Sequence, residues 1–128
     1  MMKLGLIMVL TPDLAQAERF YGDVLELDLK ASGPGQLIFD LGGAELHVFE
    51  CEAPAPAHRH AASAATVCVF EVASIEEAMA RLRARGVLFL HETPAMNALT
   101  GMRYAAFEAP GGNVHELMER PIVPARTA

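Results

Sequence analysis

The sequence is poor in cysteine and in basic residues. Its 128 residues include only Cys51 and Cys68, with no Cys-x-x-Cys spacing. A disulfide-stabilised fold is therefore not expected, and a reducing compartment, the cytoplasm, is the simpler location. Ten Lys and Arg residues against sixteen Asp and Glu residues give a net charge of −6. Because nucleic acids and anionic membranes attract basic surfaces, we expect neither as a partner.

The N-terminal apolar run is too short to cross a bilayer. Residues 4–10, LGLIMVL, are followed by Thr11, Pro12 and Asp13 without a small-residue cleavage site. We therefore expect a buried first strand rather than a signal peptide or a membrane helix. The sequence also lacks the patterns of a nucleophile elbow, a phosphate-binding loop and a zinc ribbon.

Apolar residues are abundant. Hydrophobic residues make up 52% of the chain, which excludes general disorder, and 128 residues is the size of one domain with a substantial core. In the first half, helical spacing of apolar residues predicts a helix that begins near Asp13 and ends near residue 26. Asp13 is one candidate N-cap, and Thr11 followed by Pro12 is the other. Alternation and glycine turns predict strands around this helix at residues 4–10, 28–32, 36–41 and 44–50.

The second half repeats this order. Ser74 and Glu77 form a capping-box pattern at the start of a helix that Gly86 closes. The expected strands are residues 66–72, 87–91, 102–107 and 113–119. Both halves thus read β-α-β-β-β, and neither copy is large enough to bury its sheet alone.

These boundaries predict one domain, residues 1–128, built from two modules. Module one covers residues 3–50, a linker covers 51–64, module two covers 65–119 and a C-terminal tail covers 120–128. The fold class is α+β. An unrelated α+β domain, such as a ferredoxin-like sandwich with extra strands, is the alternative.

Three segments carry a resemblance to a known superfamily. They are residues 9–21 (VLTPDLAQAERFY), 72–86 (VASIEEAMARLRARG) and 109–117 (APGGNVHEL). Each resembles a segment of the vicinal oxygen chelate superfamily, which includes glyoxalase I, extradiol dioxygenases, and fosfomycin and bleomycin resistance proteins. The resemblance implies two βαβββ modules that form a half-open mixed-sheet cup, the glyoxalase/bleomycin resistance/dioxygenase fold. It leaves the chemistry open, because this scaffold supports many functions.

The resemblance also implies four positions for metal ligands. Metal-dependent members place one ligand on the first and one on the last strand of each module, which corresponds here to Leu6, Glu45, Val67 and Glu116. Leu6 and Val67 have no donor atom. We therefore expect no metal and no other cofactor. The alternative is a divalent metal bound by Glu45, His47 and Glu116, since His47 shares a strand face with Glu45.

Glu45 and Glu116 are the candidate catalytic residues. Two carboxylates within an apolar cup are expected to have at least one raised pKa, which would provide an acid or a base. They could instead bind a cationic or hydrogen-bonding ligand, or one could pair with Arg103 or Arg19 in a structural role. Alternation predicts a ligand-binding surface lined by Leu6, Met8, Glu45, His47, Phe49, Val67, Val69, Val114, Glu116 and Met118.

The remaining histidines and cysteines receive structural assignments. We expect His58 and His60 to be solvated linker residues, His91 to lie at a strand end or in a loop, and His115 to cover the outer sheet surface. Cys68 is expected to fill apolar space, and Cys51 has no activating partner nearby in the sequence.

The sequence thus predicts a small-molecule-binding protein of the bleomycin resistance type that sequesters a drug or metabolite without a metal. The alternative is a lyase, isomerase or oxygenase of the glyoxalase or dioxygenase type that uses Glu45 and Glu116, so whether the protein is an enzyme stays open. The expected partners are a small organic molecule and a second copy of the chain. The modules could pair within one chain or between two chains.

Overall fold

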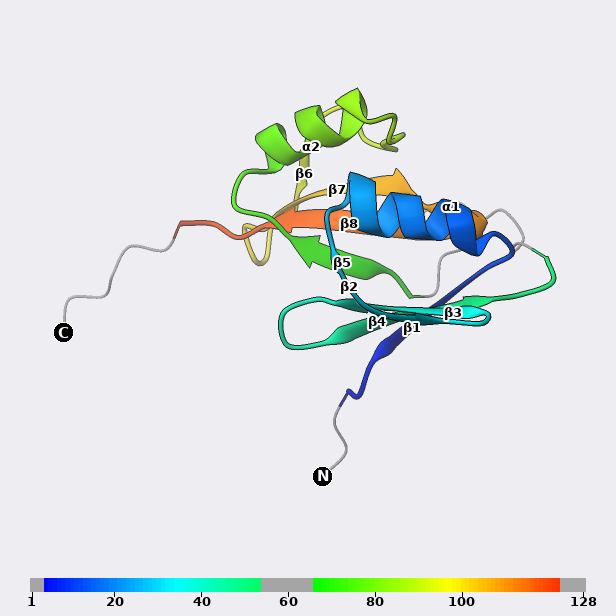
Figure 1. Cartoon of the computed structure of the whole chain (residues 1–128). Coiled ribbons are helices and arrows are strands. Elements are labelled where there is room, and N and C mark those ends of the chain that lie inside the picture. The colour runs from blue at the N-terminus through cyan, green and yellow to red at the C-terminus, as the bar shows by residue number, and fades with distance from the viewer. Residues whose placement is uncertain (1–3, 54–65, 123–128) are drawn as a thin grey trace. The chain divides into compact units, whose positions relative to one another are not determined.

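The computed structural model describes residues 4–53 and 66–122, which form two compact units. The first unit contains residues 4–53 together with Ala109–Asn113, and the second contains residues 66–108 and 114–122. The linker prediction beyond residue 53, including His58 and His60, and the tail prediction beyond residue 122 lie outside the described residues (Figure 1).

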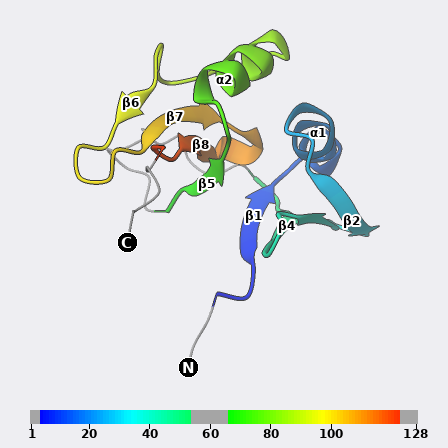
Figure 2. The same ribbon diagram turned by 90° about the vertical axis from the view of Figure 1, so that its left-hand side faces the viewer.

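The first unit is a four-stranded mixed sheet with a helical segment over one face (Figures 1 and 2). The strand order is β1-β4-β3-β2, in which β1 runs parallel to β4 and the other neighbours are antiparallel. Its elements are β1 (Ile7–Thr11), α1 (Leu14–Glu18), the π-helical η1 (Arg19–Val24), β2 (Asp28–Gly33), β3 (Gln36–Asp40) and β4 (Glu45–Glu50).

Asp13, rather than Thr11, caps the first helix. Its backbone is extended, and its Oδ1 accepts a hydrogen bond of 3.0 Å from the Gln16 amide. The helix then widens: the Leu25 amide donates to the Phe20 carbonyl at 2.9 Å, the i→i−5 spacing of a π-helix. Tyr21 is buried, with its ring centroid 5.8 Å from that of Phe39 in β3. This contact fixes the helical segment against the sheet.

The second unit repeats the architecture. Its strand order is β5-β8-β7-β6, with β5 parallel to β8 and the other pairs antiparallel. The elements are β5 (Cys68–Glu71), α2 (Ile75–Ala84), β6 (Ala95–Met96), β7 (Arg103–Glu108), the short 3₁₀ turn η2 (Pro110–Gly112), which belongs to the first unit, and β8 (Val114–Glu119). The predicted α+β class and the repeat of two βαβββ modules are confirmed.

Side chains from two parts of the second unit cap α2. Ser74 Oγ accepts a hydrogen bond of 3.3 Å from the Glu77 amide, as the capping pattern predicted. Glu119, at the end of β8, accepts a second one of 2.7 Å from the Ile75 amide. Arg103 holds that carboxylate at 2.9 Å and also pairs with Glu76. Arg103 therefore anchors the helix to the sheet.

The expected strand at residues 87–91 is not a regular strand. Phe89 makes an isolated bridge to Phe107, and the Leu90 amide donates to Ala106 at 2.8 Å. The sixth strand is instead β6, inside the segment from residue 92 to 101 that reads as a loop. There the Asn97 Oδ1 accepts hydrogen bonds from the amides of Leu99 and Thr100, which builds a turn that periodicity does not reveal. Among the described residues, no helix is long and apolar enough to span a bilayer.

The glycine-rich closing turn, η2, contacts the first strand. Gly111 has φ 78°, and a Cβ at this position would lie 2.5 Å from the Leu10 carbonyl oxygen. Asn113 Nδ2 donates to the Leu10 carbonyl at 3.1 Å and to the Pro110 carbonyl at 2.8 Å. The turn therefore needs glycine both for its conformation and for its close approach to β1.

His115 lies in the core of the second unit rather than on the outer surface. Alternation correctly places it on the face opposite Glu116, but α2 covers this face, and His115 is 1% exposed. Its ring packs edge-on against Phe70 and Phe107, with centroids 5.5 and 5.8 Å away. Burial lowers its pKa to about 4. Cys68 lies directly across the strand pair from it, and burial raises the pKa of that thiol, in keeping with the expected apolar filling.

Replacing His115 should flatten the acid dependence of stability. The unfolded state binds a proton near pH 6.5 and the folded state only near pH 4. The neutral His115 therefore stabilises the wild-type protein fully above about pH 6.5. As the pH falls from about 6.5 to about 4, the free energy of unfolding should decrease by about 3 kcal/mol. H115F keeps an aromatic ring without the titration. Urea unfolding of both proteins across this pH range tests the effect. The carboxylates contribute equally to the pH dependence of both proteins, so their contribution cancels when the two free energies of unfolding are subtracted. Parallel pH profiles would contradict it.

Adding a methyl group at Gly111 should destabilise the fold more than adding one at Gly42. Both glycines have positive φ, 78° and 74°, but a Cβ at Gly42 meets nothing within 4 Å. G42A should therefore cost about 1 kcal/mol, from backbone strain alone. G111A must also displace the β1 backbone, for about 1–3 kcal/mol more. Chemical denaturation measures both changes, and equal losses would show that the turn tolerates a side chain.

Candidate functional site

One face of the first sheet is left uncovered by the helical segment. Leu37, Phe39, Leu46 and Val48 point towards α1 and η1 and are buried. The opposite face, which we call the open face of the first sheet, carries Met8, Leu10, Gln36, Ile38, Glu45, His47 and Phe49. Met8 is 56% exposed there and Leu10 is 49% exposed. Leu6, expected to line the same surface, precedes β1.

Three charged or polar side chains form a cluster on this face. Lys30 Nζ donates to Glu45 Oε2, and His47 Nε2 lies 3.1 Å from Glu45 Oε1. Lys30 sits at a β-bulge, because the register between β2 and β3 shifts between Leu29 and Ala31. The long side chain of Lys30 crosses β3 to reach β4, because β2 and β4 flank β3 in the sheet.

Glu45 is not the poised acid that the sequence suggested. The hydrogen bond from Lys30 first, and then that from His47, holds the pKa of the Glu45 carboxyl below its usual range. The pKa of Lys30 is correspondingly raised, chiefly by Glu45. The raised pKa expected for at least one of the two carboxylates is therefore not found at Glu45: its charge is compensated, and its two oxygens hold the neighbouring side chains in place.

His47 occupies the middle of the open face. It lies directly across from Met8 on β1 and from Ile38 on β3. Its ring is tilted by 31° to that of Phe49, with centroids 6.3 Å apart. The side chain is 13% exposed, against 33% for Glu45 and 59% for Lys30. The imidazole is thus the most enclosed polar group of the cluster, with apolar neighbours on both adjoining strands.

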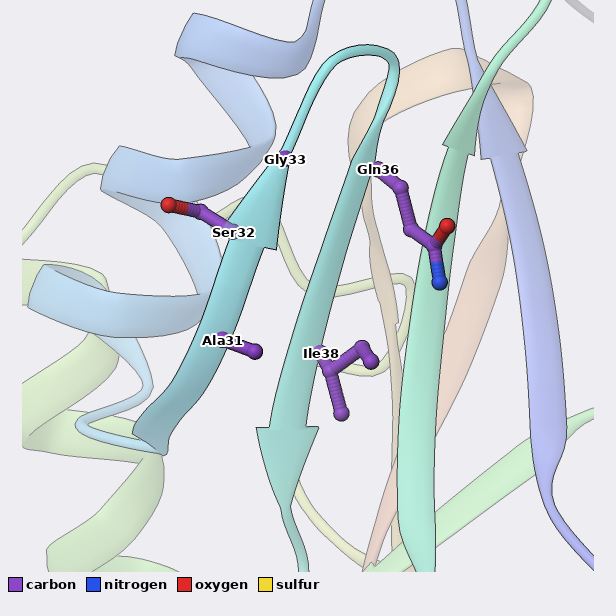
Figure 3. Close-up of a pocket in the computed structure, with 5 residues that line it drawn as sticks. All are labelled: Ala31, Ser32, Gly33, Gln36 and Ile38. Carbon is purple, nitrogen blue, oxygen red and sulfur yellow. The ribbon is translucent and has the colours of Figure 1, made fainter.

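A shallow depression of about 220 Å³ lies at the β2–β3 hairpin and includes the neighbour of His47 on β3. Its lining is Ala31, Ser32, Gly33, Gln36 and Ile38. In Figure 3, Ala31 points from β2 towards β3 and Ile38 projects from β3 on the side of β4, whereas Ser32 points the other way, towards the helical segment. The alternation of β3 predicts the place of Ile38, but the contribution of β2 depends on the bulge, which has no clear sequence signature.

The second sheet has an equivalent open face. Glu116 lies across from Val69 on β5 and from Ala106 on β7, and Met118 lies across from Tyr104. Val69 is 50% exposed, whereas Val114 is buried. Val67, another predicted lining residue, precedes β5. Glu116 belongs to the second unit and the pair Glu45 and His47 to the first.

The strand register relates the two open faces residue by residue. Met8 and Val69 each lie five positions before the N-cap of the following helix, Asp13 and Ser74. Met8 faces His47, and Val69 faces Glu116. The repeat therefore makes His47, rather than Glu45, the counterpart of Glu116. Of the expected ligand positions, Leu6 and Val67 precede β1 and β5 at equivalent places in the repeat, whereas Glu45 lies two residues before the counterpart of Glu116.

Other predicted residues lie in structural positions. His91 is half-buried in the segment after α2, where its Nδ1 accepts a hydrogen bond of 2.9 Å from the Ala106 amide and its ring packs edge-on against Tyr104. Cys51 is half-exposed, with its thiol 3.1 Å from the Ala53 carbonyl. Within the described residues, no three His, Cys, Asp or Glu side chains come together as a metal site.

The family model of the Glyoxalase/Bleomycin resistance protein/Dioxygenase superfamily matches residues 3–117. The chain belongs to this superfamily. The match includes β1, both helices and most of β8, so the resemblance carried by the three sequence segments is confirmed. None of the curated proteins matched the sequence.

Solved structures of the superfamily share the fold. A glyoxalase/bleomycin resistance protein/dioxygenase from Nocardioides is 25% identical, with a TM-score of 0.73 over 100% of this chain and 91% of that one. A glyoxalase/dioxygenase from Nostoc punctiforme is 18% identical, with a TM-score of 0.75 over 94% and 92%. A lactoylglutathione lyase from Agrobacterium tumefaciens is 22% identical, with a TM-score of 0.68 over 91% and 92%. Because their names differ in activity, the fold alone does not choose a reaction.

Proposed function

We propose that this protein binds a small organic molecule on the open face of the first sheet and so sequesters a drug or metabolite, as the bleomycin resistance name of its superfamily suggests. The observation that carries the proposal is the combination of half-exposed apolar side chains, such as Met8 and Leu10, with the enclosed cluster of Lys30, Glu45 and His47. Ligand sites in proteins usually consist of a mostly apolar surface that contains a few polar groups.

The electrostatics of the open face suit the burial of a ligand. Covering an isolated carboxylate would be costly, but Lys30 already compensates the charge of Glu45. The apolar side chains around the cluster gain about 25 cal/mol for each Å² that a ligand removes from water. An apolar or aromatic molecule with a hydrogen-bonding group therefore suits this face.

We also propose that the protein works without a transition metal. Of the four positions that the register relates, Val69 offers no donor and Met8 offers only a thioether. A soft thioether with one imidazole and one carboxylate is a poor match for zinc, iron or nickel. The proposal therefore rests on the chemistry of the side chains. The competing site remains Glu45, His47 and Glu116.

Elemental analysis of untagged protein should find far less than one equivalent of any transition metal per chain. The physical reason is the missing donors at Met8 and Val69. H47A and E116A are the informative variants. One equivalent of metal in the wild-type protein that is lost in both variants would overturn the metal-free proposal and favour the alternative site.

Truncation of Phe49 should weaken ligand binding by about 1–3 kcal/mol, because it removes apolar area from the open face. A neutral aromatic probe, 2-naphthol, is suitable, with binding followed by calorimetry and by backbone amide shifts of the full chain. L29A is the matched control, since Leu29 pairs with Phe39, whose side chain faces the helical segment. Binding unchanged in F49A, or amide shifts confined to other residues, would refute the proposed site.

An enzyme of the glyoxalase or dioxygenase type is the second candidate. The specific observation in its favour is the hydrogen bond between His47 and Glu45, since a histidine oriented by a carboxylate can transfer protons. Turnover that disappears in E45Q while ligand affinity survives would select the enzyme over the binding protein.

We further propose a homodimer in the cytoplasm. Apolar side chains on the edge strands, Met8 on β1 and Val69 on β5, would be shielded by a second copy, and the low cysteine content suits a reducing compartment. Light scattering of the full chain tests the dimer, and a strict monomer would refute it.

A further inference from the structure

The hydrogen-bonded cluster fixes which nitrogen of His47 carries a proton. Glu45 is ionised, because Lys30 stabilises its charged form, so its oxygens can only accept hydrogen bonds. The Nε2 atom of His47, 3.1 Å from Glu45 Oε1, must therefore be the donor. In the neutral imidazole, a proton on Nε2 leaves an unshared electron pair on Nδ1.

The apolar surroundings of His47 make the electron pair on Nδ1 selective for ligands that carry a hydrogen-bond donor. Met8 and Ile38 lie across from it on the adjoining strands, and Phe49 packs at the side of the ring. A ligand that covers this face displaces water from Nδ1. If the ligand offers a donor, its hydrogen bond to Nδ1 replaces the one from water. If the ligand offers none, Nδ1 is left as a buried acceptor without a hydrogen bond.

We infer that His47 Nδ1 is the hydrogen-bond acceptor with which the open face of the first sheet selects aromatic molecules that carry a neutral, weakly acidic O–H group, phenols above all. The inference rests on the proposed function and names its ligand class. His47 contacts the ligand, whereas Glu45 and Lys30 are positioning residues that hold the imidazole in one tautomer.

Charged ligand groups fit this position less well. An anion would be attracted by Lys30, but that ammonium is already paired with Glu45, and the anion would also meet the electron pair of Nδ1 and the carboxylate of Asp40, which lies directly across from Glu45. An ammonium group would compete with Lys30, which already occupies Glu45 Oε2. A phenol needs no rearrangement of the cluster, since it only donates.

The test compares 2-naphthol with 2-methoxynaphthalene, which has the same rings but no donor. Calorimetry on the full chain at neutral pH should give about tenfold tighter binding of 2-naphthol, the ratio that one net hydrogen bond supplies. H47F should remove this preference, so that the two probes bind with equal affinity, because the ring that replaces the imidazole has no acceptor. E45L should reduce the preference in part.

The positioning role has its own readout. Long-range ¹H–¹⁵N spectra should show the His47 proton on Nε2 in the wild-type protein and a mixture of tautomers in E45L. D40N is the matched control. Asp40 lies directly across from Glu45 but makes no hydrogen bond to His47 among those described, so the tautomer of His47 should not change in this variant. An Nδ1–H tautomer in the wild-type protein would overturn the inference.

The outcomes separate the two proposals. Equal binding of both probes, with amide shifts on the open face, would refute the phenol inference and leave the binding function intact. A preference for 2-naphthol that survives in H47F would also refute it. If neither probe shifts the amides of the open face, the proposed binding site fails and the inference fails with it.

Discussion

The packing of one helical segment on one face of each sheet is the constraint on which the rest of the structure depends. A four-stranded sheet has two faces, and each module has a single helix to cover them. Tyr21 and Phe39 fix the first pairing, and the contacts of Glu119 and Arg103 with the start of α2 fix the second. The remaining face of the first sheet keeps apolar side chains such as Met8 and Leu10 in contact with water, and a ligand gains free energy by covering them.

Within the first module, three side chains from two strands give the open face its polar character. Lys30 on the edge strand β2 donates to Glu45 on β4, and His47 lies within hydrogen-bond distance of the same carboxylate. The pair with Lys30 converts a carboxylate that could act as an acid into a fixed counter-ion, and it leaves the imidazole of His47 as the group that can form a further hydrogen bond.

Local signals predicted much of this fold. The caps at Asp13 and Ser74, the strand alternation and the glycine turns depend on neighbouring residues, so the sequence reveals them. The candidate site was harder to predict from the sequence. His47 and Glu116 were recognised as facing residues, but Lys30 was missed because its partner Glu45 is fifteen residues away, on a strand that does not pair with β2. The roles of His115, Arg103 and Asn97 depend on which helix covers a face or how a turn closes, and these are tertiary facts that periodicity does not contain.

The contact of the closing turn with β1 has a consequence for how the chain folds during synthesis. The first unit is discontinuous in sequence, since it includes Ala109–Asn113 as well as residues 4–53. Gly111 and Asn113 reach the Leu10 backbone across about a hundred residues, a contact of high sequence separation. A ribosome that has released only the first module has therefore not yet supplied every segment of the first unit. Until residues 109–113 emerge, the Leu10 carbonyl lacks its partner Asn113, and an unpaired group on a strand of this kind can pair with a neighbouring nascent chain.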